Sequence, residues 1–309
     1  MADVLITIDT ELSPGLHQRG FSPAENHAAS IEGRAGDEVV GVGWQMDRLK
    51  THGLRGVFFV DPMPALVYGP EVLPPIVAPI LARGHEVQLH LHTEWLAWAS
   101  ASPVGGRQAR NIGDFALDDQ LALIALARDL LQAAGAPRPT AFRAGNFGAD
   151  ARTLVALQRL GFAWDSSVNE GFAESLPATA ALGWAGELPV SGLIDRPGHV
   201  RPAQICALSR REMTVALRHA ADHPNPFVIV SHSFEMLSRD RRRANRAVMA
   251  RFEAMCRTIA TTPGLRSAGF DDLASPTEIV QAPMLKSNGL RTAGRMIEQA
   301  VATLRYERA

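Results

Sequence analysis

Short apolar runs alternate along this chain with longer stretches in which apolar residues recur every three or four positions. Runs such as VLITI (4–8) and GVFFV (56–60) have the composition of strands buried on both faces. The stretch 116–135 has the spacing of an amphipathic helix, and Gly135 ends it. Regular alternation of strand and helix predicts a parallel sheet wrapped by helices. The predicted strands are 4–8, 56–60, 86–92, 140–145, 162–168, 226–234 and 265–270, and the predicted helices are 38–53, 74–84, 116–135, 150–161, 209–223 and 243–264.

The number of strands and the length of 309 residues predict an α/β fold, a (β/α) barrel of seven or eight parallel strands. A doubly wound open sheet is the competing architecture, although no G-x-G-x-x-G motif follows the first strand. In the first predicted helix, Val39, Val42, Met46 and Leu49 share one face. We expect one catalytic domain over 1–275 and a partly helical C-terminal extension over 276–309.

Three segments rich in glycine, proline and polar residues are predicted to be loops. They cover 12–36, 99–116 and 169–203, and each follows a predicted strand. Barrels and open α/β sheets both place their active sites at the carboxyl ends of the strands. These loops are therefore expected to border the functional site.

Ionisable side chains stand at the ends of the predicted strands. Because the carboxyl ends of parallel strands share one edge, residues far apart in sequence are expected to converge there. A set of carboxylates and imidazoles is a usual ligand set for a divalent metal ion such as zinc. The residues in question are Asp9, Glu11, His90, His92, Glu94, Arg143, Asp165 and His232.

The segment HLHTE (90–94) leaves two arrangements of metal ligands open. His90 and His92 point to the same side if the strand continues through both residues. If the chain turns helical after His90, Glu94 comes alongside His90 instead. Either arrangement uses His90.

Composition and charge narrow the expected setting of the protein. The net charge of −1 gives no reason to expect a nucleic-acid partner, and no apolar run is long enough to cross a bilayer. The N-terminal segment lacks the features of a signal peptide, and the two cysteines, Cys206 and Cys256, are too few for a disulfide framework. We therefore expect a cytoplasmic protein, and the sequence leaves its oligomeric state open.

Five ordered segments resemble the polysaccharide deacetylases with NodB homology, the carbohydrate esterase family 4 group. They are LITIDTE, GHEVQLHLHTEW, FRAGNFG, WDSSV and VIVSHSFE, spread over about residues 3–275. The likeness is to members of the family without a signal peptide. It implies a distorted barrel and removal of acetyl groups from N-acetylated sugars at a bound divalent metal, with zinc expected first and cobalt, manganese or nickel as alternatives.

The resemblance also implies roles for individual residues. Asp9 matches the family's base, Arg143 the arginine that holds the base, and His232 the acid. Asp165 matches the aspartate of the fourth block loosely, and would keep His232 protonated. His90 matches the first metal histidine. Thr10 replaces the usual second aspartate, so Glu11 is the nearest carboxylate for the metal, and His92 or Glu94 completes the set.

Two other functions remain open from the sequence. The same scaffold could hydrolyse another linear or cyclic amide, because fold alone does not fix the substrate. A degenerate site could instead bind sugar without catalysis. The five tryptophans offer stacking surfaces for sugar rings, and the basic segment SRDRRRANR (238–246) is either a solvated helix start or a patch that binds phosphate.

Overall fold

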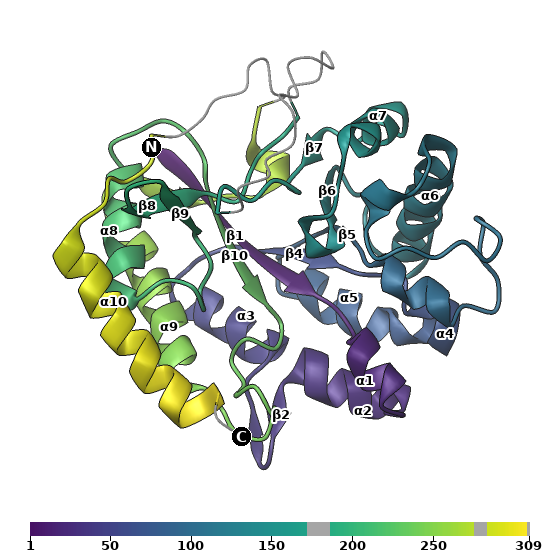
Figure 1. Ribbon diagram of the computed structural model, residues 1–309, viewed down its shortest axis with the longest axis horizontal. Helices are drawn as coiled ribbons and strands as arrows, with labels where there is room; N and C mark the ends of the chain where they lie inside the picture. The colour runs from purple at the N-terminus through teal and green to yellow at the C-terminus, as the bar shows by residue number, and fades with distance from the viewer. Residues whose placement is uncertain (172–185, 275–282, 308–309) are drawn as a thin grey trace.

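The computed structural model describes residues 1–171, 186–274 and 283–307 (Figure 1). Its main sheet has seven parallel strands in the order β10-β1-β4-β5-β6-β7, and β11 pairs with the first residues of β1. The strands are β1 (Ala2–Thr10), β4 (Val57–Val60), β5 (Glu86–Leu91), β6 (Ala141–Ala144), β7 (Trp164–Asp165), β10 (Phe227–His232) and β11 (Leu265–Ser267). Two short antiparallel hairpins lie outside it, β2 (Arg34–Ala35) with β3 (Glu38–Val39) and β8 (Gly192–Arg196) with β9 (His199–Pro202).

Irregular backbone joins the two ends of this sheet, β7 and β10. The amide of Leu188 donates to the carbonyl of Asp165 at 2.7 Å, and the amide of Ser191 donates to the carbonyl of Val228 at 3.0 Å. The amide of Ile205 adds a further bond to the carbonyl of Val230 at 3.1 Å. The sheet is therefore a curled, distorted (β/α) barrel, as predicted, and not a doubly wound open sheet.

Helices surround the barrel, with α6 and α7 on one side and α8, α9 and α10 on the other (Figure 1). Among the described residues, no helix is both long and apolar enough to span a membrane. The longer helices are α3 (Val42–Thr51), α5 (Pro74–Ala82), α6 (Leu117–Ala133), α7 (Ala151–Arg159), α8 (Arg210–Ala220), α9 (Arg246–Thr261) and α10 (Gly289–Ala302). The shorter ones are α1 (Pro14–Gln18), α2 (Pro23–His27), α4 (Ala65–Tyr68), the π-helices η1 (Ala28–Glu32) and η8 (Thr303–Glu307), and the 3-10 helices η2 (Pro70–Val72), η3 (Thr93–Ala97), η4 (Ile112–Asp114), η5 (Gly145–Phe147) and η7 (Phe270–Asp272).

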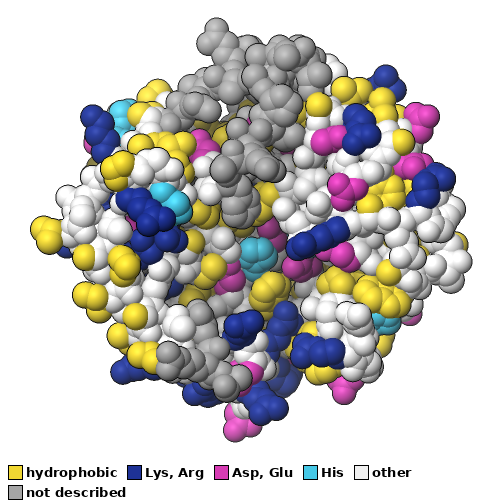
Figure 2. Space-filling model, viewed as in Figure 1, with side chains coloured by type: hydrophobic (Ala, Val, Ile, Leu, Met, Phe, Trp, Pro, Cys, Tyr) yellow, Lys and Arg dark blue, Asp and Glu magenta, His cyan; other side chains and the backbone are white. Residues whose placement is uncertain are grey.

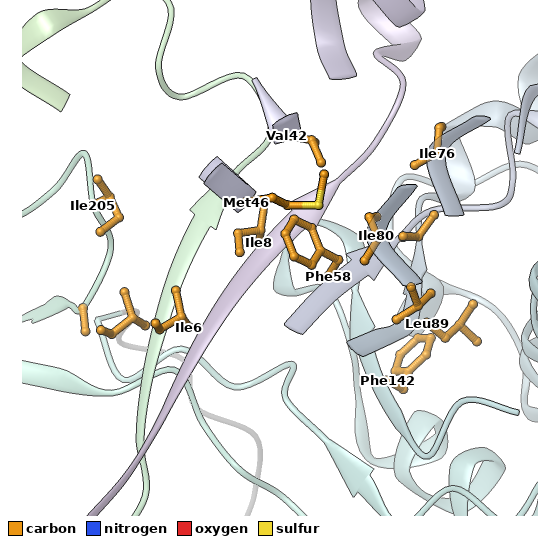
Figure 3. Close-up of a cluster of buried hydrophobic side chains, with 14 of the residues drawn as sticks. Ile6, Ile8, Val42, Met46, Phe58, Ile76, Ile80, Leu89, Phe142 and Ile205 are labelled. Carbon is orange, nitrogen blue, oxygen red and sulfur yellow. The ribbon is translucent and has the colours of Figure 1, made fainter. Parts of the chain in front are cut away.

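Alternate residues of each strand face opposite sides of the sheet. Residues such as Ile8 of β1 and Phe58 of β4 pack outward against Met46 of α3, in the cluster drawn in Figure 3. Residues such as Leu5 and Phe59 belong to a second cluster, inside the barrel. Burial of each such side chain stabilises the fold by about 1.5–3 kcal/mol. Both faces of the strands are therefore apolar, which explains their continuous apolar sequences.

The prediction for the segment before α3 was wrong in one respect. Val39 lies in β3 and is exposed, while α3 begins only at Val42. The backbones at Gly33 and Gly41 approach so closely that a Cβ on Gly41 would lie 2.2 Å from the carbonyl oxygen of Ile31. This contact closes the hairpin of β2 and β3, which includes residues 38 and 39 of the predicted helix.

The segment predicted as the first loop, 12–36, contains α1 and α2. Each helix begins with a serine N-cap followed by proline, at Ser13-Pro14 and Ser22-Pro23. Serine at the N-cap and proline at the first helical position are recognised start signals. Helices of five residues are too short for apolar periodicity, so only these caps could have revealed them.

In the C-terminal region, α10 packs against α8 and β8. The predicted boundary between a catalytic domain and an extension falls at 275/276, outside the described residues. The division into two parts therefore stays a prediction.

Candidate active site

The alternation of the strands directs four polar side chains into the barrel at one end of the sheet. Asp9 follows Leu5 at even spacing on β1, and His232 follows Val228 on β10, so both face the interior. Strand register places Asp9 beside His232 and His90 beside Arg143. Four separate sequence blocks are thereby brought together, as the sequence predicted.

Asp9 and Arg143 form a buried ion pair. Arg143 Nη1 donates to Asp9 Oδ1 at 2.7 Å, and the side chains are 0% and 3% exposed. The guanidinium also donates to the Thr7 and Ser166 hydroxyls at 2.8 and 3.0 Å. Burial opposes ionisation of Asp9, but the surrounding positive charges, first that of Arg143, together outweigh burial and lower the pKa of this carboxyl. Asp9 is therefore an ionised, fixed carboxylate, suited to accept a proton.

Glu11, His90 and His92 form a cluster whose ligand-type atoms all lie within 4.8 Å of one another. Glu11 Oε2 is 2.6 Å from His92 Nε2 and 3.4 Å from His90 Nε2. Atoms that share one zinc ion at about 2.0–2.2 Å are roughly 3.3–3.6 Å apart in a tetrahedral site. Burial opposes ionisation of Glu11, yet the adjacent imidazoles hold its pKa well below the usual range. The spacing and the charge both suit a divalent cation.

The outer nitrogens of both imidazoles are held by the protein. His90 Nδ1 contacts the carbonyl oxygen of Arg143 at 2.8 Å, and His92 Nδ1 contacts Glu94 Oε2 at 3.0 Å. Because each Nδ1 donates there, each Nε2 faces Glu11 and would be the ring atom that binds a metal ion. The buried Glu11 Oε2 has no well-directed hydrogen bond among the described residues. Glu11, His90 and His92 therefore fit a metal ion as three ligands. Hydrogen bonds to the carbonyl of Arg143 and to Glu94 hold the two imidazoles in place.

The local backbone places His92, and not Glu94, beside His90 and Glu11. The strand ends at Leu91, His92 keeps an extended conformation, and the 3-10 turn begins only at Thr93. His92 consequently joins His90 and Glu11, whereas Glu94 lies on the outer side of the His92 ring. Asn146 Nδ2 fixes Glu94 by donating to its Oε1 at 2.8 Å. Glu94 supports a cluster residue and is not itself part of the cluster.

His232 lies between two carboxylates. Its Nε2 is 3.8 Å from Asp9 Oδ2, and its Nδ1 is 2.9 Å from Glu235 Oε1. Burial disfavours the imidazolium. The hydrogen bond and charge of Glu235, and to a smaller extent the charge of Asp9, nevertheless raise the pKa of His232 to about 9. His232 is therefore protonated at neutral pH and can donate a proton.

The predicted partner of His232, Asp165, makes different contacts. Asp165 accepts from the Ser167 hydroxyl at 2.5 Å, and burial raises the pKa of this carboxyl. Burial and the neighbouring Asp165 hold the pKa of Glu187 well above its usual range. The predicted contact was wrong because Glu235, three residues after His232, reaches the imidazole through the turn that follows β10. A catalytic role for Asp165 stays a prediction.

Two features of the site were missed in the sequence. Asp61, directly after β4, is buried among the cluster histidines, and burial raises its pKa to about 6. Its place directly after a buried strand was the sequence signal that could have revealed Asp61.

The second feature is Gly145, because a Cβ at this position would lie 2.7 Å from His92 Nδ1. Of the tryptophans, Trp95 and Trp164 are buried, Trp98 is 36% exposed, and Trp184 lies outside the described residues.

Comparison with known proteins identifies the fold. No protein-family model and no curated protein sequence matches the chain. Among solved structures, a candidate polysaccharide deacetylase from Mycobacterium smegmatis aligns with a TM-score of 0.55 and 17% identity, over 92% of this chain and 95% of that one. The chain is thus similar in fold to the polysaccharide deacetylases.

Proteins with other activities share this fold. The PuuE allantoinase aligns with a TM-score of 0.53 and 12% identity, over 88% of both chains. A 4-alpha-glucanotransferase from Thermococcus litoralis aligns with a TM-score of 0.53 and 11% identity, over 92% of this chain and 42% of that one. Because one fold supports several reactions, the function has to be argued from the site.

Proposed function

We propose that this protein is a metal-dependent amide hydrolase that removes the N-acetyl group from an N-acetylated sugar or glycan precursor. One observation carries the proposal: the carboxylate Asp9 and the protonated His232, 3.8 Å apart, flank a cluster of metal-ligand type. Glu11, His90 and His92 would hold the ion, which we propose to be zinc. The deacetylase named for the fold neighbour from Mycobacterium smegmatis supports the choice of substrate class.

In the proposed reaction the protein's own residues move protons on either side of the scissile bond. A divalent ion bound at the cluster would supply a more acidic water and a polarised amide carbonyl. Asp9, held ionised by Arg143, accepts the proton of the attacking water. His232, kept protonated by Glu235, donates to the departing amine, which is a poor leaving group without that proton. Each group therefore starts in the protonation state that its step requires.

The setting of this activity is part of the proposal. Both cysteines of the chain, Cys206 and Cys256, are free thiols. Free thiols fit the reducing cytoplasm. A cytoplasmic enzyme of this kind would act on a soluble or membrane-linked precursor, before any export of the glycan.

The test is acetate release by zinc-loaded protein from N-acetylglucosamine and its short oligomers. We expect release by the wild type and a loss of about 10²–10⁴-fold in D9N and in H232A, as for removal of a general base or acid. D118N, a matched change at an exposed aspartate on α6, should keep full activity.

Two results would redirect the proposal. Ammonia or ring-opened product from allantoin without acetate release from sugars would favour hydrolysis of a cyclic amide, the activity named for the PuuE fold neighbour. Sugar binding with no hydrolysis of any amide, in zinc-, cobalt- or manganese-loaded protein, would favour a binding module.

A further inference from the structure

A cavity of about 650 Å³ opens beside His232, and its lining does not include Glu11, His90 or His92. The segment after β10, helix α9 and the end of α10 form its walls. Its lining includes three arginines, Arg239, Arg241 and Arg251, and one carboxylate, Glu235, which already binds His232. Basic side chains also gather beside the central histidine and acidic side chains in the space-filling view (Figure 2). The cavity is thus a cationic extension of the proposed active site.

Arg251 is a buried arginine with a free donor. It is 3% exposed, its Nε donates to Glu298 at 2.6 Å, and its Nη1 donates to the carbonyl of Cys206 at 3.0 Å. Its Nη2 is buried and has no hydrogen-bond partner in the described part of the chain. Buried donors are rarely left unpaired because desolvation is costly. A free donor in the wall of a cationic cavity points to a ligand that accepts hydrogen bonds.

Arg241 brings a second guanidinium to the cavity at the expense of backbone strain. Its φ is 57°, in the left-handed region that residues with a Cβ avoid. Its guanidinium lies 4.7 Å from the centre of the Phe234 ring, and Nη1 donates to Ser30 Oγ at 2.9 Å. Within the described ranges, neither Arg241 nor the exposed Arg239 has an ion pair with a carboxylate. Two arginines of the lining therefore have no direct ion-pair partner among the described residues.

We propose that this cavity binds a phosphoryl group carried by the substrate, so that the protein acts on a phosphorylated N-acyl sugar. The inference rests on the proposed function, because His232 connects the cavity to the proposed reaction centre. A phosphoryl group carries about −1.5 to −2 charges at neutral pH, which matches two unpaired arginines better than a carboxylate would. Guanidinium groups bind phosphate oxygens with two parallel donors. The volume is that of a site for a small molecule.

The kinetic test compares N-acetylglucosamine with N-acetylglucosamine 1-phosphate in the zinc-loaded enzyme. The variant R239Q/R241Q removes both unpaired charges from the cavity, and R242Q/R243Q removes two charges from the same segment outside its lining. We expect the wild type to prefer the phosphorylated sugar. The preference should fall by at least about tenfold in R239Q/R241Q, as for the loss of a charge-assisted hydrogen bond, and remain in R242Q/R243Q.

Three results would overturn the inference: no preference for the phosphorylated sugar, equal losses in both double variants, or an equal preference for the carboxylate of N-acetylmuramic acid. UDP-N-acetylglucosamine, as an additional substrate, distinguishes a nucleotide-linked phosphate from a terminal one. A thermal melt of each variant verifies that the fold is intact.

Calorimetric titration with inorganic phosphate separates failure of the inference from failure of the proposed function. If the wild type releases acetate from neither sugar, the deacetylase proposal fails. Phosphate should still bind about tenfold more weakly to R239Q/R241Q than to the wild type or R242Q/R243Q. Equal binding to all three proteins, or no binding, would contradict the phosphate site itself.

Discussion

The imidazoles of His90 and His92 each use Nδ1 within the protein and direct Nε2 at the carboxylate of Glu11. The two rings pack edge to face with centroids 4.8 Å apart, so neither can rotate without displacing its neighbour. Preorganised rings of this kind reduce the entropy that is lost on metal binding. At the scale of single residues, the chemistry therefore depends on the groups that hold the rings.

Gly145 helps to position His92 because it has no side chain to displace the ring. Ala at this position would place a Cβ 2.7 Å from His92 Nδ1 and displace the ring from Glu94 and Glu11. We expect G145A to bind zinc about 10–100-fold more weakly in a competition titration with a chelator. In G43A, where a Cβ would meet nothing within 4 Å, zinc affinity should not change. Wild-type affinity in G145A would show that the His92 position is not required.

Glu235 sets the protonation of His232. The pKa of His232 is raised, so its proton is present at neutral pH and is lost as pH rises through about 9. Activity that needs this proton should therefore fall at alkaline pH. In E235Q the charge that supports the imidazolium is gone, so the alkaline limb of kcat/KM should move to lower pH. D47N, a change at an exposed carboxylate, is the control, and an unmoved limb in E235Q would exclude Glu235 as the cause.

At the scale of elements, register and alternation assemble the site. The pairing of β1 with β10 places Asp9 next to His232, and the pairing of β5 with β6 places His90 next to Arg143. A shift of one residue in either pair would turn one partner out of the barrel. The site is therefore specified by the apolar residues that fix each register, such as Leu5 and Val228.

The junction of β7 with the segment that begins at residue 186 buries two carboxyls, Asp165 and Glu187, whose pKa values are both raised, first by burial. The folded state binds a proton at these carboxyls more tightly than the unfolded state does. The pair therefore lowers the free energy of unfolding as the pH rises above the usual pKa of a carboxyl group. E187Q mimics the protonated carboxyl. We expect its melting temperature to exceed that of the wild type by about 2–4 °C at pH 8, and by less at pH 5.

Differential scanning calorimetry of wild type and E187Q over this pH range measures the effect. The exposed change E71Q is the control and should follow the wild type. A difference in melting temperature that does not depend on pH would mean that the two carboxyls do not share a proton.

At the scale of the whole molecule, helix α10 is tied to the barrel through buried charges. Arg295 Nη2 donates to Asp195 Oδ2 of β8 at 2.9 Å, and Nε donates to Glu212 Oε1 of α8 at 3.1 Å. The side chains of all three are at most 4% exposed. The end of this helix also forms part of the cationic cavity. The C-terminal region thus contributes to both stability and the proposed binding site.

Removal of this arginine should be strongly destabilising. R295A removes the ion-pair partner of the buried Glu212, while Asp195 keeps Arg201 and His199. We expect a loss of about 3 kcal/mol in the free energy of unfolding, measured by urea denaturation. R305A removes an exposed arginine of the same C-terminal region and should cost less than about 0.5 kcal/mol. A small effect of R295A would mean that the other contacts of α10, such as the Arg251–Glu298 ion pair, are sufficient to hold it.

The sequence predicted the barrel and its principal strands because runs such as VLITI and GVFFV are almost entirely apolar. It also predicted the convergence of Asp9, Arg143 and His232, since strand ends share an edge. It could not distinguish Glu235 from Asp165 as the partner of His232, because that contact depends on the turn after β10. Likewise, α1 and α2 are too short for periodicity.

The central claim is that Glu11, His90 and His92 hold a divalent metal ion on which hydrolysis depends. The most direct measurement is the ratio of zinc to protein, by mass spectrometry of protein dialysed against zinc, for wild type, H90A/H92A and H219A/H223A. The control pair also consists of neighbouring histidines, with ring centroids 4.7 Å apart on and beyond α8. We predict about one zinc per chain in the wild type and the control, and none in H90A/H92A. Equal zinc in all three, or none in the wild type, would contradict the claim.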